Sequence, residues 1–151
     1  MAAPQFGAPE PGRRYKDRPA AFGIAVQEGA IALVRVEKPG HAAWLDLPGG
    51  ALDPGEDEAQ ALVREFGEET GLAIEAGAAF ARADQYFLNT KGKAFNNRAG
   101  FWTVAGWREA AGLKIEADHT LVWLDPHEAL ARLRHEAHAW AVAAWLRRRA
   151  V

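Results

Sequence analysis

The sequence of 151 residues contains no cysteine, which excludes disulfide bonds, a thiol nucleophile and a cysteine-based zinc site. It also has no run of 18 apolar residues, the length that a transmembrane helix needs. Residues 1–12 lack the hydrophobic stretch of a secretory signal peptide. We therefore expect a cytoplasmic protein that does not associate with membranes.

The sequence also lacks an excess of positive charge, because it contains 18 Lys and Arg residues and 20 Asp and Glu residues. Proteins that bind nucleic acids irrespective of sequence carry a basic surface, so we expect no stable nucleic-acid binding. The length and the hydrophobic content of 49% suit one globular domain. Residues 1–14, rich in Ala, Pro and Gly, indicate a flexible arm, and residues 15–151 the domain. A monomer and a homodimer both stay open.

Residues 58–70 show the period of an amphipathic helix. Asp57 is a favourable N-cap, Gln60 completes a capping box three residues later, and Gly71 stands where a glycine ends many helices. The apolar positions that recur at i, i+3, i+4 and i+7 are Ala59, Leu62, Val63 and Phe66. We expect this apolar stripe to face a hydrophobic core.

Apolar, β-prone segments lie on both sides of this helix. A hairpin with its turn at residues 27–29 is predicted over residues 20–36. A polar turn is predicted at residues 89–93, and further strands at residues 44–47, 73–76, 79–88, 99–107 and 121–124. Asp125 and Pro126 open a second helix, and residues 135–149 form a closing helix. This order predicts an α/β protein with a mixed sheet between helices.

Three glutamates, Glu65, Glu68 and Glu69, crowd one side of the first helix at i, i+3 and i+4. Taken alone, such a run is more often a solvated acidic face. Arg64 can pair with Glu68 or turn toward Glu56, but one guanidinium cannot neutralise four carboxylates. A hard divalent cation with oxygen ligands, such as Mg²⁺ or Mn²⁺, can do so.

Residues 50–72, GALDPGEDEAQALVREFGEETGL, resemble the signature sequence of the Nudix hydrolases, G-x5-E-x7-R-E-U-x-E-E-x-G-U, where U is a bulky apolar residue. Every fixed position is filled, by Gly50, Glu56, Arg64, Glu65, Phe66, Glu68, Glu69, Gly71 and Leu72. The resemblance implies the Nudix fold, a mixed β-sheet sandwiched between α-helices (α/β/α). It also implies hydrolysis of a nucleoside diphosphate linked to another moiety, with Mg²⁺ as cofactor and Mn²⁺ as a substitute.

The resemblance further implies roles for individual residues. Metal binding falls to Gly49 through its carbonyl, Glu65, Glu68, Glu69 and, outside the signature, Asp118. Glu68 and Glu69 are the first candidates for the base that activates water. Outside the signature, Asp118 is the best placed acid for this role, and Glu109 and Glu116 are weaker candidates. Glu56 and Arg64 are expected to support catalysis as a pair that fixes the preceding loop to the helix.

The residues chosen for contact with the substrate are Arg35, Trp44, Tyr86, Asn97 and Arg98. Arginines can meet phosphates, whereas an aromatic ring beside an amide suits a nucleobase. A plain turn at residues 96–97 is the alternative. We expect a small-molecule substrate, a nucleoside triphosphate, ordinary or oxidised, that is cleaved to a monophosphate and pyrophosphate. ADP-ribose or a nucleotide sugar, and a domain that senses nucleotides without cleaving them, stay open. Hydrolysis of nucleic-acid 5′ ends fits poorly, since no long basic groove is visible.

Overall fold

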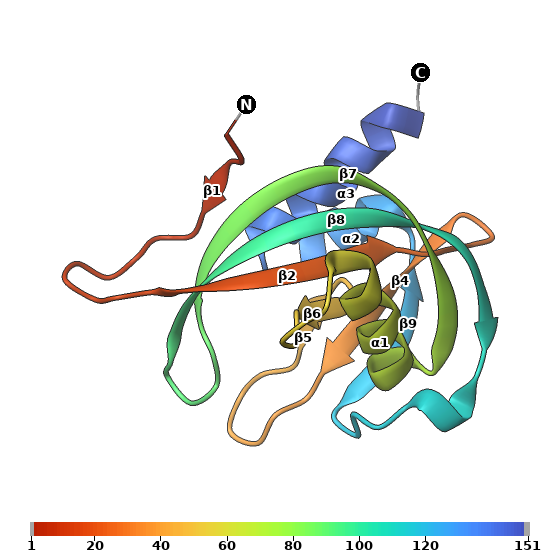
Figure 1. Cartoon of the computed structure of the whole chain (residues 1–151), viewed down its shortest axis with the longest axis horizontal. Coiled ribbons are helices and arrows are strands. Elements are labelled where there is room, and N and C mark those ends of the chain that lie inside the picture. The colour runs from red at the N-terminus through yellow and green to blue at the C-terminus, as the bar shows by residue number, and fades with distance from the viewer. Residues whose placement is uncertain (1, 150–151) are drawn as a thin grey trace.

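The computed structural model describes residues 2–149, and in that range it has three α-helices and nine strands (Figure 1). The helices are α1 (Glu58–Thr70), α2 (Pro126–Arg132) and α3 (Glu136–Arg149). The strands are β1 (Gln5–Phe6), β2 (Lys16–Ile24), β3 (Val26–Gln27), β4 (Ala30–Val36), β5 (Trp44–Asp46), β6 (Gly49–Ala51), β7 (Leu72–Leu88), β8 (Ala94–Glu109) and β9 (His119–Leu124). A short 3-10 helix, η1 (Ala111–Leu113), follows β8. Among these described residues, no helix is long and apolar enough to cross a membrane.

Parallel and antiparallel pairs combine in one sheet with the strand order β1-β7-β8-β2-β6. β7 and β8 form an antiparallel hairpin, β8 runs parallel to β2, and β2 is antiparallel to β6. In a second sheet, β4 pairs antiparallel with β3, β5 and β9. The predicted mixed α/β architecture is therefore confirmed, and so is the turn between β3 and β4.

Helices cover both faces of the first sheet. Alternate residues of a strand point to opposite sides, so β2 contacts a helix on each side. On one side of β2, Ala21 belongs to the apolar cluster that contains Leu62 and Phe66 of α1. On the other side, Phe22 belongs to the cluster that contains Val142 of α3. Figure 1 shows α1 in front of the strands and α2 and α3 behind them. This is the α/β/α arrangement that the signature implied.

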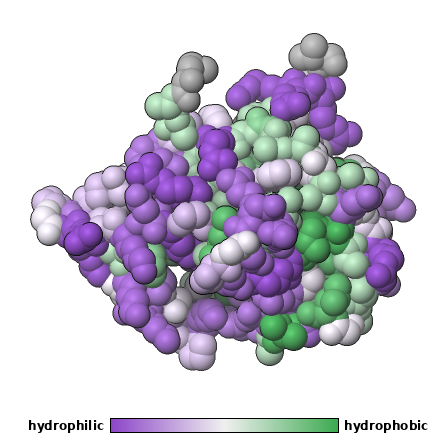
Figure 2. All heavy atoms as spheres, viewed as in Figure 1, coloured by the Kyte–Doolittle hydropathy of each residue, from purple (hydrophilic) through white to green (hydrophobic). Residues whose placement is uncertain are grey.

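The capping of α1 follows the prediction, but the buried stripe is shifted. Asp57 and Gln60 form the expected reciprocal capping box, and Gly71 ends the helix with a left-handed φ of 74°. Val63, however, is 41% exposed, so its predicted place in the core is wrong. Leu62 and Phe66 define the centre of the buried face, and Val63 lies at its rim because each helical residue turns about 100° from the last. Figure 2 shows a mostly hydrophilic face with apolar residues gathered on the side of α1 and η1.

The strand boundaries differ from the prediction where strands are long. The two segments predicted at residues 73–76 and 79–88 form one strand, β7, with register shifts near Ala76 and Ala79. Such bulges interrupt the pattern without ending the strand. β8 starts at Ala94, so residues 96–97 do not form a turn, and the turn lies at residues 89–93 as predicted.

The N-terminal segment lies against the first sheet. Gln5 and Phe6 pair parallel with β7, and the side-chain amides of Gln5 and Asn96 exchange two hydrogen bonds of 2.9 and 3.2 Å. Residues 4–6 of the segment predicted as a flexible arm, residues 1–14, thus pair with β7, and the flexibility of the arm stays a prediction. Paired backbone groups give even a low-complexity segment a fixed position.

Candidate active site

The last turn of α1 carries the most buried of the signature glutamates. Glu69 is 7% exposed, and its Oε1 accepts a hydrogen bond of 3.0 Å from the main-chain N–H of Gly49. Its Oε2 lies 3.5 Å from Nε2 of His119 on β9. Burial raises the pKa of Glu69 well above its ordinary value, and the neighbouring charge of Glu65 raises it further. The helix thus presents a carboxylate that is costly to ionise without a cation.

Arg64 ties the loop before α1 to the helix. Its Nε and Nη2 donate to both carboxylate oxygens of Glu56 over 2.8 and 2.9 Å, and Nη2 also donates to the carbonyl of Ala51 over 3.1 Å. Nη1 reaches Glu65 at 3.0 Å and Glu68 at 3.2 Å. The hydrogen bonds from Arg64 lower the pKa of Glu56, and those to Glu56 raise the pKa of Arg64. Nε also lies 3.3 Å from a carboxylate oxygen of Asp53, so one guanidinium is shared by four carboxylates.

Glu65 lies between Arg64 and the glycine loop, residues 48–50, which leads from β5 into β6. Burial raises its pKa, and the hydrogen bond from Arg64 only partly offsets this effect. A Cβ on Gly50 would stand 2.9 Å from the carboxyl carbon of Glu65, so a larger residue there would displace this carboxylate. Glu65, Glu68 and Glu69 offer hard carboxylate oxygens as metal ligands. Their negative charges outnumber the one positive charge of Arg64 beside them. This donor set fits a divalent cation of the Mg²⁺ type.

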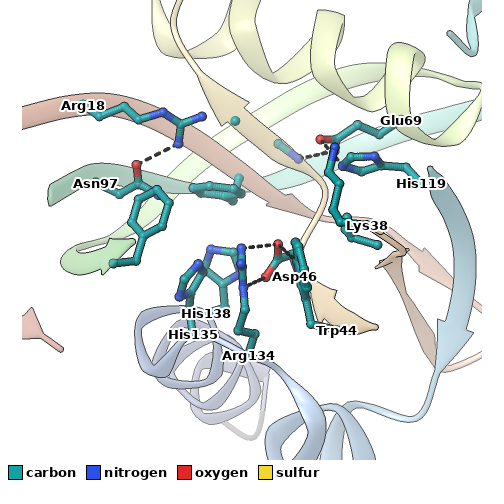
Figure 3. Close-up of a pocket in the computed structure, with 15 residues that line it drawn as sticks. Arg18, Lys38, Trp44, Asp46, Glu69, Asn97, His119, Arg134, His135 and His138 are labelled. Carbon is teal, nitrogen blue, oxygen red and sulfur yellow. Dashed lines mark hydrogen bonds and ion pairs between the residues drawn. The ribbon is translucent and has the colours of Figure 1, made fainter. Parts of the chain in front are cut away.

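A pocket of about 170 Å³ opens beside Glu69 (Figure 3). The glycine loop contributes Gly49 and Gly50 to its wall. The other lining residues are cationic (Arg18, Lys38, Arg134), aromatic (Phe22, Trp44, Phe87), aliphatic (Val36) or polar (Asp46, Asn97, His119, His135, His138). Cations beside a carboxylate site suit a phosphate chain, and aromatic walls suit a planar ring.

Two of the five predicted substrate contacts line this pocket, Trp44 and Asn97. Arg35 pairs with Glu37 at the surface, outside the pocket. Tyr86 packs edge-on against Tyr15, with ring centroids 5.1 Å apart. Arg98 bridges Asp17 and Asp84. The structure brings neither Tyr86 nor Arg98 to the pocket beside Glu69, and their predicted contact with the substrate stays untested.

Asp118 lies next to the pocket, at the start of β9. Its carboxylate forms an ion pair with Lys38 and lies 2.7 Å from Nδ1 of His119, and these contacts hold its pKa at about 2. Ligand atoms of Glu116, Asp118 and His119 lie within 4.8 Å of one another, a spacing that would suit a metal ion. Since His119 also approaches Glu69, Asp118 is linked to the signature carboxylates through one imidazole.

Sequence reasoning missed the polar floor of the pocket. The carboxylate of Asp46 accepts from Nε1 of Trp44 over 3.0 Å and from Nη2 of Arg134 over 2.8 Å. Arg18 donates to Oδ1 of Asn97 over 2.8 Å. His135 and His138 open α3, and burial lowers the pKa of His135 to about 3. The i, i+3 spacing of the two histidines was the only signal in the sequence that placed both on one helix face.

The fold and the site define a family. The sequence profile of the NUDIX domain matches residues 16–146, and the chain belongs to that family. It is 31% identical over 108 residues to the Escherichia coli CTP pyrophosphohydrolase, an alignment that covers 71% of this chain and 75% of that protein. It is 36% identical over 95 residues to a Bacillus subtilis protein provisionally named 8-oxo-dGTP diphosphatase. That alignment covers 62% of each protein, so the chain spans less than two thirds of this relative's length.

Solved structures agree with the assignment of the fold. The Escherichia coli ORF135 protein superposes with a TM-score of 0.69 at 27% identity, covering 90% of this chain and 93% of that one. A NUDIX hydrolase from Nitrosomonas europaea gives a TM-score of 0.68 at 21% identity, covering 86% and 88%. The predicted Nudix fold is confirmed.

Proposed function

We propose that this chain is a Mg²⁺-dependent pyrophosphohydrolase that cleaves a nucleoside triphosphate, ordinary or oxidised, to a nucleoside monophosphate and pyrophosphate. The observation that carries the proposal is the position of Glu69. Its buried carboxylate lines a pocket that also contains cationic and aromatic side chains. Such a pocket matches a substrate with a polyphosphate chain at one end and a planar base at the other.

Glu65, Glu68 and Glu69 would hold the divalent cation, for which Mn²⁺ is the expected substitute. When bound, the ion would neutralise phosphate oxygens and lower the pKa of a coordinated water. Glu68 and Glu69 remain the candidates for the base that accepts the proton of water as its oxygen bonds to phosphorus and the bridging P–O bond breaks. Arg18, Lys38 and Arg134 line the pocket as cations that can bind phosphate oxygens.

The names of the relatives support this class of substrate. The proteins from Escherichia coli and Bacillus subtilis are named for CTP and 8-oxo-dGTP. An Erythrobacter litoralis relative, 37% identical over 60 residues that make up 36% of its length, is named an RNA pyrophosphohydrolase. We also propose that the protein acts in the cytoplasm, as a monomer or a homodimer.

The test is product analysis by ion-exchange chromatography with Mg²⁺ and a panel of substrates. The panel holds ordinary and oxidised nucleoside triphosphates, ADP-ribose, a nucleotide sugar and a 5′-triphosphorylated RNA. Glu69→Gln serves as the inactive control. Release of pyrophosphate from one or more triphosphates, lost in the control, is the expected result. The proposal would be overturned if only ADP-ribose or the nucleotide sugar were cleaved. It would also be overturned if no substrate were cleaved with Mg²⁺ or with Mn²⁺.

A further inference from the structure

His138 occupies the floor of the pocket with a fixed ring orientation. The main-chain N–H of Leu47 donates to Nδ1 of His138 over 3.1 Å. A backbone N–H can only donate, so Nδ1 is the acceptor and the ring proton of neutral His138 lies on Nε2. Burial holds the pKa of His138 well below its ordinary value, which keeps the ring neutral.

The Nε2–H of His138 faces the pocket. Among residues 2–149, every side-chain nitrogen or oxygen that is fully shielded from solvent has a hydrogen-bond partner. Nε2 has no such partner, although His138 is only 2% exposed, so this atom must reach the small accessible part of the ring. His138 lines the pocket (Figure 3). Its ring centroid lies 4.4 Å from that of Phe22. An N–H at the pocket wall that no protein group accepts from can donate to a bound ligand.

Asn97 offers a second donor by the same argument. Its Oδ1 accepts from Arg18, which fixes the amide so that Nδ2 is the free end. Asn97 is 3% exposed and lines the pocket, and Nδ2 has no partner among the described residues. Asp46 supplies an acceptor beside these donors, since each carboxylate oxygen can accept more than one hydrogen bond. The rings of Trp44 and Phe87 line the same pocket as these polar groups.

We propose that His138 is a specificity-determining residue whose Nε2–H donates to a ring carbonyl of the nucleobase, with Asn97 as a second donor and Asp46 as the acceptor. Guanine, uracil, cytosine and 8-oxoguanine carry such a carbonyl, whereas adenine carries none. The pocket therefore selects carbonyl-bearing bases against adenine, because a site built to donate to a substrate group rejects the analogue that lacks it. This inference rests on the proposed function for the identity of the ligand.

Two substitutions separate the two nitrogens of the ring. In His138→Asn, the side-chain oxygen can replace Nδ1 as the acceptor for Leu47, but no donor reaches the position of Nε2. In His138→Gln, the longer amide can place an N–H near the position of Nε2, while Leu47 loses its acceptor. His127→Asn is the matched control, because the His127 side chain is 78% exposed on α2, outside the pocket.

The experiment compares ITP with ATP, two purine substrates that differ in whether position 6 carries a carbonyl or an amino group. The wild-type protein should have the higher kcat/KM for ITP. His138→Asn should lower the ratio of the two kcat/KM values about tenfold, mainly through the KM for ITP, as expected for one lost hydrogen bond. His138→Gln should keep most of the ratio, and His127→Asn all of it. An unchanged ratio in His138→Asn, or equal preference in the wild type, would overturn the inference.

Binding separates this inference from the proposed function. Isothermal titration calorimetry with IMP and AMP, which are not cleaved, measures base recognition without turnover. If no triphosphate is hydrolysed but IMP binds more tightly than AMP and His138→Asn removes the difference, the proposed function fails and the role of His138 stands. If triphosphates are hydrolysed and IMP and AMP bind alike, the proposed function stands and the role of His138 is refuted.

Discussion

The main-chain N–H of Gly49 donates to Oε1 of Glu69 over 3.0 Å, which joins the glycine loop to the last turn of α1. This hydrogen bond favours the ionised carboxylate, but burial outweighs it and keeps the pKa of Glu69 well above its ordinary value of 4.5. The loop therefore positions a carboxylate that the fold alone does not stabilise in its charged form. Such a group is typical of a functional site.

The first prediction concerns the pH dependence of stability without metal. A carboxyl group with a raised pKa in the folded state stabilises the fold below its unfolded pKa, and this stability is lost as pH rises toward the folded pKa. The free energy of unfolding of the wild type should therefore fall relative to that of Glu69→Gln between about pH 4.5 and neutrality. Urea denaturation in a chelator measures the difference. The difference in unfolding free energy between the wild type and Glu128→Gln, an exposed substitution, should not change with pH in this way. A difference between the wild type and Glu69→Gln that does not change with pH would refute the raised pKa of Glu69.

The second prediction is that metal binding offsets the loss of stability caused by ionised Glu69. A ligand that binds only the folded state stabilises it by about 2.7 kcal/mol at a hundredfold excess over Kd. We expect Mg²⁺ to raise the Tm of the wild type by about 8 °C at that excess, and a chelator to abolish the gain. In Glu69→Gln the gain should be largely lost and turnover should fall about a hundredfold. Differential scanning fluorimetry suffices for the first measurement. A full gain in the variant would place the ion elsewhere.

Replacing the shared guanidinium by an ammonium is the third prediction. Lysine cannot donate in parallel to both oxygens of Glu56 and still reach Glu65 and Glu68. Arg64→Lys should lower the free energy of unfolding by about 1 kcal/mol and turnover by about tenfold. Arg132→Lys changes an exposed pair with Glu128 on α2 and should alter both quantities very little. Equal effects of the two substitutions would show that the network around Arg64 contributes nothing beyond a surface ion pair.

The signature and its helix were predictable because their interactions are local. The capping box, the Glu56–Arg64 pair and the carboxylates fall within one short segment whose spacing fixes their geometry. The pocket floor was not predictable, because Arg18, Asp46 and His138 come from distant parts of the chain. Only the packing of α3 against the sheet brings them together, and no local pattern encodes that packing.

Strand parity explains why some of the predicted substrate contacts lie next to a pocket residue in the sequence but outside the pocket. Successive side chains in a strand point to opposite faces, so an error of one position exchanges pocket for surface. Phe87 lines the pocket and Tyr86 does not; Val36 lines it and Arg35 does not. Asn97 lines the pocket, whereas its neighbour Arg98 does not. Composition indicated the right segments, but the face of each strand depends on the whole sheet.

The fourth prediction tests the glycine loop. Gly49 has a φ of 143°, and a Cβ there would lie 2.1 Å from the carbonyl oxygen of Ala21. Because the obstacle is backbone of β2, it cannot move aside as a flexible side chain could. Gly49→Ala should destabilise the fold by about 3 kcal/mol, measured by urea denaturation. The control Gly112→Ala adds a methyl group where no atom lies within 4 Å and should change stability by less than about 0.5 kcal/mol.

The last prediction uses His135, which faces the pocket beside Arg18, Arg134 and His138. Burial and the two arginines lower its pKa from 6.5 to about 3. The folded state therefore binds fewer protons than the unfolded state between these values, so stability is lost as pH falls through that window.

For His135 alone, the loss amounts to about 2 kcal/mol at pH 5 relative to neutral pH. We expect His135→Gln to narrow the difference in unfolding free energy between about pH 7 and pH 5 by that amount, while the lowered pKa of His138 keeps part of the acid sensitivity. His127→Gln, which alters an exposed histidine, should leave the pH dependence as it is in the wild type. If His135→Gln and the wild type lose stability in parallel, His135 is already protonated in the folded state, and the floor of the pocket is wetter than its burial implies.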